Sequence, residues 1–274
     1  MTSDEASRVA APSGKTESTV TVQGIATHLF EAGPPTAPTL LYLHGTSLGN
    51  LWLEYHNALA QQFHVLAPDT PGFGLTERPD WMRDMSDYIL YFRDFLDELG
   101  LDQVLLVGHS LGGWMAAELA VWYPERVKKL VLSNATGIRV KGTPTANLFA
   151  MNAQELVSTI FDNLMAAMPL MPAAFDIDFL LTQYRERTTL ASLAWNPEYD
   201  PKLERRLAWV KCPTLIIWGQ NDRLIPPAYA DAFHQQIPHS EVVKLEGTGH
   251  MPMFEKHEEW SNAICEFLNR STHE

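Results

Sequence analysis

The chain has 274 residues, of which 46% are hydrophobic and 19% charged, and its formal net charge is −13. Such a composition is ordinary for one large globular domain or for a core with an insertion. The negative charge disfavours nucleic acid and anionic membrane surfaces as partners. No apolar run is long enough for a membrane span, and the polar residues 1–8 lack the apolar region of a signal peptide. We therefore expect no membrane association and a cytoplasmic location.

Short β-rich runs alternate with helical patterns after a flexible tail at residues 1–16. The first two runs, Thr19–Gln23 and Ala26–Glu31, predict an antiparallel pair. Several later runs are continuously apolar, which is typical of parallel strands buried on both faces. These later runs are Thr39–Leu43, Phe63–Pro68, Gln103–Val107, Leu130–Ser133, Thr214–Trp218 and Glu241–Leu245. The helical patterns are Trp52–Gln62, Ser86–Leu99, Leu111–Tyr123, Pro227–Ile237 and Glu255–Asn269. This alternation predicts a doubly wound, mostly parallel α/β sheet.

One interval, residues 137–206, has no strand pattern. It contains helical segments rich in Met and Phe, interrupted by several prolines. We therefore predict a helical cap over 137–206, inserted into a core formed by residues 17–136 and 207–274. Cys212 and Cys265 lie far apart in sequence and have no metal-ligand spacing, so we expect two buried thiols and no metal site.

The motif GHSLG at residues 108–112 lies between a predicted buried strand and a predicted helix. Gly-x-Ser-x-Gly at this junction is the nucleophile-elbow pattern, in which a tight turn exposes the serine at the carboxyl edge of the sheet. The helix N-terminus that follows favours negative charge at the reacting centre. The alternative is a glycine-rich turn with an incidental serine.

A serine hydroxyl needs a base to take its proton, and the base needs an orienting carboxylate. Asp222 follows the predicted strand Thr214–Trp218, and His250 follows Glu241–Leu245. The carboxyl ends of parallel strands meet at one edge of the sheet, where Ser110 is expected. Taken singly, Asp222 reads equally as a helix-capping carboxylate and His250 as an exposed loop histidine. Their order and their places at strand ends together predict a Ser110–His250–Asp222 triad.

These motifs, together with LLYLHGTSLG (40–49), APDTPGFGLTERP (67–79) and the stretches around Asp222 and His250, resemble the α/β-hydrolase fold family, in its lidded serine hydrolase (esterase-like) group. The resemblance runs from Ser18 to Leu268 and is specific for the fold and triad but weak for the substrate. It implies an eight-stranded sheet with a helical cap inserted after the sixth strand. It also implies an oxyanion hole, formed by the backbone N–H groups of Leu111 and of Thr46 in the loop after the third strand. Ser47 is a close competitor for Thr46.

Methionines in the cap and beside His250 are our predicted substrate contacts, since Met adapts to varied apolar shapes. They are Met165, Met168, Met171 and Met251. The alternative for each is a place in the core of the cap. An apolar lining favours a small to medium apolar ester as the substrate, without a cofactor.

A serine nucleophile argues against epoxide hydrolases and haloalkane dehalogenases of this fold, which use a carboxylate. It leaves lactonases, cofactor-free haloperoxidases and C–C bond hydrolases of the meta-cleavage-product type. Met251 stands where such C–C hydrolases often have Trp, which disfavours that alternative. A non-catalytic or slow ligand receptor on the same scaffold is a further alternative, and the oligomeric state is not predicted.

Overall fold

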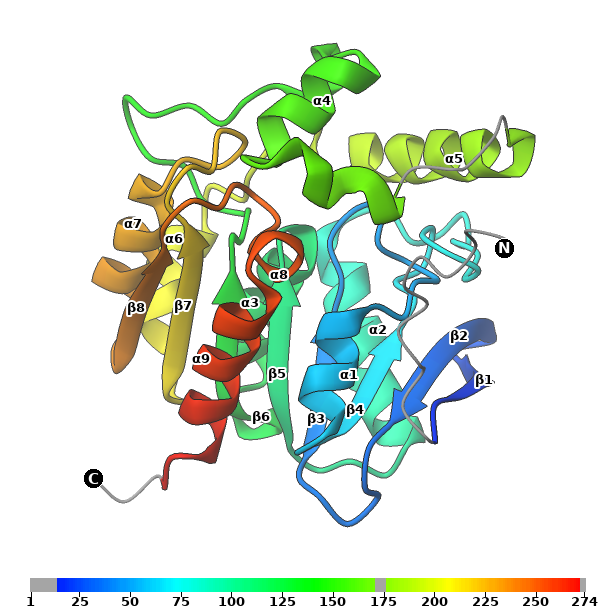
Figure 1. Cartoon of the computed structure of the whole chain (residues 1–274). Helices are drawn as coiled ribbons and strands as arrows, with labels where there is room; N and C mark the ends of the chain where they lie inside the picture. The colour runs from blue at the N-terminus through cyan, green and yellow to red at the C-terminus, as the bar shows by residue number, and fades with distance from the viewer. Residues whose placement is uncertain (1–13, 171–175, 272–274) are drawn as a thin grey trace, which may run out of the picture.

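The fold, seen here in a computed structural model that describes residues 14–170 and 176–271, is built on one eight-stranded sheet of order β1-β2-β4-β3-β5-β6-β7-β8 (Figure 1). Strands β1 and β2 pair antiparallel, β2 pairs antiparallel with β4, and the other neighbours pair parallel. The strands are β1 (Thr16–Val22), β2 (Ile25–Ala32), β3 (Thr39–Leu43), β4 (His64–Pro68), β5 (Val104–His109), β6 (Val127–Ser133), β7 (Thr214–Gly219) and β8 (Ser240–Leu245). The predicted mostly parallel eight-stranded α/β sheet is confirmed. Most of the predicted tail lies outside the described residues, and β1 already begins at Thr16.

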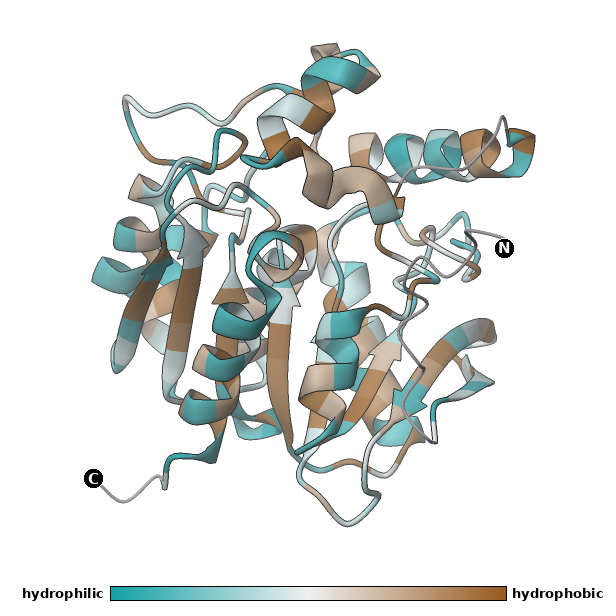
Figure 2. Cartoon of the chain, in the orientation of Figure 1, coloured by the Kyte–Doolittle hydropathy of each residue, from teal (hydrophilic) through white to brown (hydrophobic). Residues whose placement is uncertain are grey.

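Helices cover both faces of the sheet (Figure 1). One face packs against α1 (Glu54–Ala60) and α9 (His257–Asn269), and the other against α2 (Met85–Glu98), α3 (Leu111–Trp122) and α7 (Ala228–Gln236). The strand side chains alternate between these two cores: Leu40 and Tyr42 point to one, Leu41 and Leu43 to the other. The central strands are accordingly apolar along their length, whereas the outer helix faces are polar (Figure 2).

Strand β6 begins three residues before the predicted Leu130, because Lys129 is buried in the sheet. Its Nζ donates hydrogen bonds to the carbonyl oxygens of Phe267 (2.8 Å) and Leu268 (3.0 Å) near the C-terminus of α9, and to that of Arg270. The last carbonyls of a helix have no intrahelical partner and carry partial negative charge. These carbonyls therefore supply the hydrogen-bond acceptors that the buried Lys129 ammonium needs. The sequence pattern alone placed this lysine outside the strand.

The chain between β6 and β7, residues 134–213, is hereafter called the insertion. In its described part it contains α4 (Ala153–Ile160), α5 (Ile177–Ala194), α6 (Leu203–Arg206) and the 3₁₀ helices η2 (Leu148–Ala150), η3 (Leu164–Leu170) and η4 (Leu207–Trp209), and no strand of the sheet. Helices α4 and α5 lie beyond the carboxyl ends of the strands (Figure 1). The remaining elements are the short helices η1 (Pro124–Arg126) and α8 (Pro252–Glu255).

Cys212 and Cys265 are both buried free thiols, as expected. Within residues 14–170 and 176–271, none of the helices combines the length and the apolarity that crossing a bilayer requires.

Candidate active site

Ser110 occupies a sharp turn between β5 and α3. Its backbone angles, φ 53° and ψ −116°, lie outside the regions that non-glycine residues ordinarily adopt. The close approach of the flanking chain requires glycine: a Cβ on Gly108 would lie 2.3 Å from the Gly112 carbonyl oxygen, and one on Gly112 would lie 2.1 Å from that of Leu43. The strained turn holds the serine side chain at the carboxyl edge of the sheet, at the N-terminus of α3.

Ser110, His250 and Asp222 form a hydrogen-bonded chain although they come from three separate loops. The Ser110 hydroxyl donates to His250 Nε2 at 2.9 Å, and His250 Nδ1 donates to Asp222 Oδ2 at 2.8 Å. All three residues are buried, with the serine the most accessible at 9%. The loops follow β5, β7 and β8. The arrangement suits transfer of the serine proton to an imidazole whose tautomer is fixed by a carboxylate.

The Asp222 carboxylate is held by donors on both oxygens. Its Oδ1 accepts the backbone N–H groups of Leu224 (2.9 Å) and Ile225 (2.8 Å), and its Oδ2 accepts Asn134 Nδ2 at 2.7 Å in addition to His250. Asn134 is fully buried and directly follows β6, the neighbour of both β5 and β7. Sequence reasoning missed this residue, although its place at a strand end is the signal that identified the other loops.

The loop after β3 brings Thr46 to the same place. Thr46 and Leu111 both line the cavity that contains Ser110, whereas Ser47 does not. The Ser47 hydroxyl donates to Gln183 Oε1 of α5 at 2.9 Å. The Ser47 N–H stabilises the charged form of the buried Glu186 carboxylate. Burial raises the pKa of Glu186, and the N–H groups of Gly74 and Ser47 oppose that effect. The insertion thus engages Ser47 and leaves Thr46 facing the cavity.

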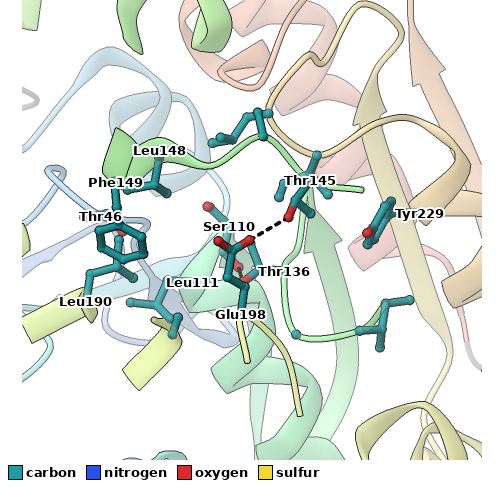
Figure 3. A pocket seen from close by; sticks show the side chains of 16 residues that line it. Thr46, Ser110, Leu111, Thr136, Thr145, Leu148, Phe149, Leu190, Glu198 and Tyr229 are labelled. Carbon is teal, nitrogen blue, oxygen red and sulfur yellow. Dashed lines mark hydrogen bonds between the residues drawn. The ribbon is translucent and has the colours of Figure 1, made fainter. Parts of the chain in front are cut away.

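The cavity at Ser110, hereafter the inner cavity, has a volume of about 50 Å³. Its lining is mostly apolar and comes from the insertion, from the loop after β7 and from α7 (Figure 3). Among the described residues that line it, Glu198 carries the single charge and there is no Lys or Arg. The lining residues are Thr46, Ser110, Leu111, Thr136, Gly137, Ile138, Thr145, Ala146, Leu148, Phe149, Leu190, Ala194, Glu198, Leu224, Ile225 and Tyr229.

Three of the four predicted methionine contacts, Met165, Met168 and Met251, do not line this cavity. Met165 and Met168 lie on the outer face of η3, 70% and 60% exposed, and Met251 is buried in the core beneath α1 and α9. Met171 lies outside the described residues. Leu148 and Phe149 of η2 and Leu190 of α5 lie there instead. A composition rich in Met does not indicate which face of a short helix turns inward.

The insertion also contacts the loop that carries His250. The His250 N–H donates to the Ile160 carbonyl at 2.6 Å. Glu255 of α8 joins the same two segments, because its carboxylate accepts the N–H groups of Gly249 (2.7 Å), Asp162 (2.7 Å) and Asn163 (2.6 Å). The position of His250 is therefore coupled to the docking of the insertion.

Comparison with known proteins accords with this fold. The family model described as "Alpha/beta hydrolase family" matches residues 40–263, most of the chain. The chain belongs to the alpha/beta hydrolase family. The resemblance on which the expected sheet rested is thereby confirmed, and the protein is a hydrolase of this fold.

Individual relatives differ in their chemistry. A 2-hydroxy-6-oxononadienedioate/2-hydroxy-6-oxononatrienedioate hydrolase of Pseudomonas putida is 31% identical over 252 residues, covering 85% of this chain and 88% of the relative. An uncharacterized protein of Mycobacterium tuberculosis (strain ATCC 25618 / H37Rv) is 27% identical over 259 residues, covering 85% and 76%. The crystal structure of a putative lipase from Acinetobacter baumannii AYE superposes with a TM-score of 0.78 at 26% identity, covering 93% of this chain and 91% of that one. The proteins similar to this hydrolase thus include one named as a dienedioate hydrolase and one named as a putative lipase.

Proposed function

We propose that this hydrolase cleaves a small, apolar, uncharged carboxylic ester through an acyl-enzyme formed on Ser110. His250 acts as the base, Asp222 orients it, and the N–H groups of Leu111 and Thr46 form the oxyanion hole. The observation that carries the choice of substrate is the lining of the inner cavity, which is apolar and has Glu198 as its single charge.

In the first half of the reaction, His250 Nε2 takes the proton of Ser110 as Oγ attacks the ester carbonyl carbon. The carbonyl oxygen becomes an oxyanion. It is stabilised by the N–H of Leu111, which begins α3 and so has no intrahelical acceptor, and by the N–H of Thr46. The tetrahedral intermediate then expels the alkoxide, which takes the proton from His250 and leaves as the alcohol.

In the second half, His250 takes a proton from water, and the resulting hydroxide attacks the acyl-enzyme carbonyl. The intermediate collapses, Ser110 Oγ leaves and recovers a proton from His250, and the carboxylic acid is released. Asp222 stabilises the imidazolium that forms twice in the cycle, while its two backbone donors and Asn134 hold it in place.

C–C bond cleavage is the second candidate, because the 31% identical relative is named as a hydrolase of an oxo acid and not of an ester. Such relatives are named for a dienedioate and a dienoic acid, and both substrates carry carboxylates. Binding a carboxylate in an apolar cavity beside Glu198, with no cationic side chain in its described lining, costs both desolvation and repulsion. A neutral ester avoids both costs.

The test is a substrate panel with the purified protein. It contains ethyl acetate, ethyl butyrate, a small lactone, a vinylogous diketone acid and a halide with peroxide as haloperoxidase substrates. We expect turnover of the short-chain esters, covalent labelling of Ser110 by a small fluorophosphonate, and loss of ester turnover by about 10⁴-fold or more in Ser110→Ala. Faster turnover of the diketone acid than of every ester would favour C–C cleavage. Labelling without turnover of any member would favour a receptor.

A further inference from the structure

A second cavity adjoins the inner one and is hereafter called the outer cavity. Its volume is about 340 Å³, against about 50 Å³ for the inner cavity. The two cavities share four lining residues, Ile138, Thr145, Glu198 and Tyr229. Two of these are joined: the Thr145 hydroxyl donates to Glu198 Oε2 at 2.8 Å, as the dashed line in Figure 3 shows. The Glu198–Thr145 pair therefore forms part of the wall between the two spaces.

Three aromatic rings contribute to the walls of the outer cavity, whose lining also includes the polar side chains of Arg139 and Asn196. Trp195, Tyr199 and Tyr229 all line it. The Trp195 ring is 63% exposed and lies 5.0 Å from the ring of Phe149, which lines the inner cavity. The three rings come from the end of α5, from the segment that follows it and from α7.

Polar contacts hold two of these rings in place. Arg139 Nη1 donates to the Tyr199 hydroxyl at 3.3 Å, and its guanidinium lies 5.7 Å from the centre of the same ring. The Tyr229 hydroxyl donates to the Thr143 carbonyl at 3.0 Å. Rings held in this way offer preformed faces and edges to a flat ligand, which loses little entropy when it binds.

The two cavities differ in size, so each can hold a different part of a substrate. The inner cavity, at about 50 Å³, is much smaller than the outer cavity, so it suits a short acyl chain better than a large alcohol group. An ester held at Ser110 with a short acyl chain in the inner cavity must place any larger alcohol group elsewhere. The outer cavity, which shares the Glu198–Thr145 pair with the inner cavity, is the neighbouring space.

We propose that the outer cavity is the subsite for the alcohol part of the ester and that it selects an aromatic alcohol, such as a benzyl group, with the Glu198–Thr145 pair marking its boundary. The inference rests on the proposed ester hydrolysis. It adds a chemical class for the leaving group, which the triad does not determine.

The experiment compares three acetates, ethyl, cyclohexylmethyl and benzyl, by kcat/KM. They share one acyl group, and the two larger alcohols have similar size and similar leaving ability. We expect benzyl acetate to exceed cyclohexylmethyl acetate by roughly 2- to 10-fold, the range that aromatic pairs supply. In Trp195→Ala and in Tyr199→Leu, the ratio of benzyl to ethyl acetate should fall by a similar factor. Trp209→Ala is the matched control, because Trp209 is 57% exposed and lines neither cavity.

Equal rates for the benzyl and cyclohexylmethyl esters in the wild type would overturn the aromatic subsite. An equal loss of kcat/KM on all three esters in both variants would also overturn it, because that pattern would indicate disturbed packing at Phe149 and not loss of a subsite. Saturation-transfer NMR with benzyl alcohol on Ser110→Ala needs no turnover and separates this inference from the proposed function. Binding that weakens when Trp195→Ala is added supports the subsite even if no ester is cleaved, and absence of binding refutes it.

Discussion

Glu118 offers a direct test of the electrostatics that join α3, the helix that begins directly after Ser110, to the insertion. Its carboxylate is 2% exposed and accepts hydrogen bonds from Trp122 Nε1 (3.1 Å) and from Arg206 Nη2 (2.8 Å) of α6, while Arg206 also pairs with Asp200. Burial disfavours the charged form and raises the pKa of Glu118 from 4.5 to about 7; Arg206 opposes this effect and Asp200 adds to it.

The sign of the resulting pH dependence follows from the raised pKa. The folded protein holds this proton more tightly than the unfolded chain, so the contribution of Glu118 to stability is complete below pH 4.5 and is lost as the pH rises through about 7. A difference of one pKa unit is worth about 1.4 kcal/mol, so the loss is roughly 3 kcal/mol in all. Most of it falls between about pH 5 and about pH 8.

Replacing Glu118 by Gln removes this titration. The free energy of unfolding of Glu118→Gln should therefore rise relative to the wild type by roughly 2–3 kcal/mol from about pH 5 to about pH 8, whatever constant offset the altered contacts add. Urea unfolding followed by circular dichroism across this range measures the difference. Glu98→Gln, at an exposed position of α2, is the control. Glu186 and Glu255 also have raised pKa values, but the wild type and both variants retain them, so their titration cancels in the difference between variant and wild type. A difference that stays constant with pH would refute the reasoning.

Three further predictions concern the site. Asn134→Ala should lower kcat by about 10- to 100-fold with little change in KM, since a buried hydrogen bond to a charged group is worth about 1.5–3 kcal/mol; Asn221→Ala, which removes an exposed amide bonded to Asp162, is the control, and an unchanged kcat would contradict the positioning role. Glu198→Gln should raise kcat/KM for ethyl hydrogen succinate relative to ethyl butyrate by roughly tenfold, because it removes the negative charge of the inner cavity; an unchanged ratio would show that this charge does not select the substrate. Glu255→Ala should lower the free energy of unfolding by about 1–3 kcal/mol, measured by urea unfolding, because it leaves three N–H groups without their acceptor; no loss relative to the exposed Glu259→Ala would show that water replaces the carboxylate.

The sheet was predictable because its central strands are buried on both faces and so read as continuous apolar runs. All eight expected strands occur, with ends that differ by a few residues. The starts of β1 and β6 differ most, by three residues each. At β6 the difference arises where a charge is buried: Lys129 donates to carbonyls at the end of α9, more than a hundred residues away. Local patterns do not encode a partner at that separation.

The meeting of Ser110, His250 and Asp222 was predictable for the same reason. Parallel strands bring their carboxyl ends to one edge, so a residue just after a strand has a known place even when its partners are distant in sequence. Asn134 fulfils this criterion too, but an amide suggests no chemistry by itself. Its role is visible only once its Nδ2 is found 2.7 Å from Asp222 Oδ2.

The residues that line the inner cavity follow no such rule. Leu148, Phe149 and Leu190 reach the inner cavity while Met165 and Met168 face solvent, and all five are apolar residues of one insertion. What decides between them is how the insertion docks, through contacts such as that of Ile160 with the His250 loop. The catalytic chemistry is thus encoded at strand ends, where position follows from topology. The lining of the cavity is determined by tertiary packing, and proteins similar to this chain carry names as different as putative lipase and dienedioate hydrolase.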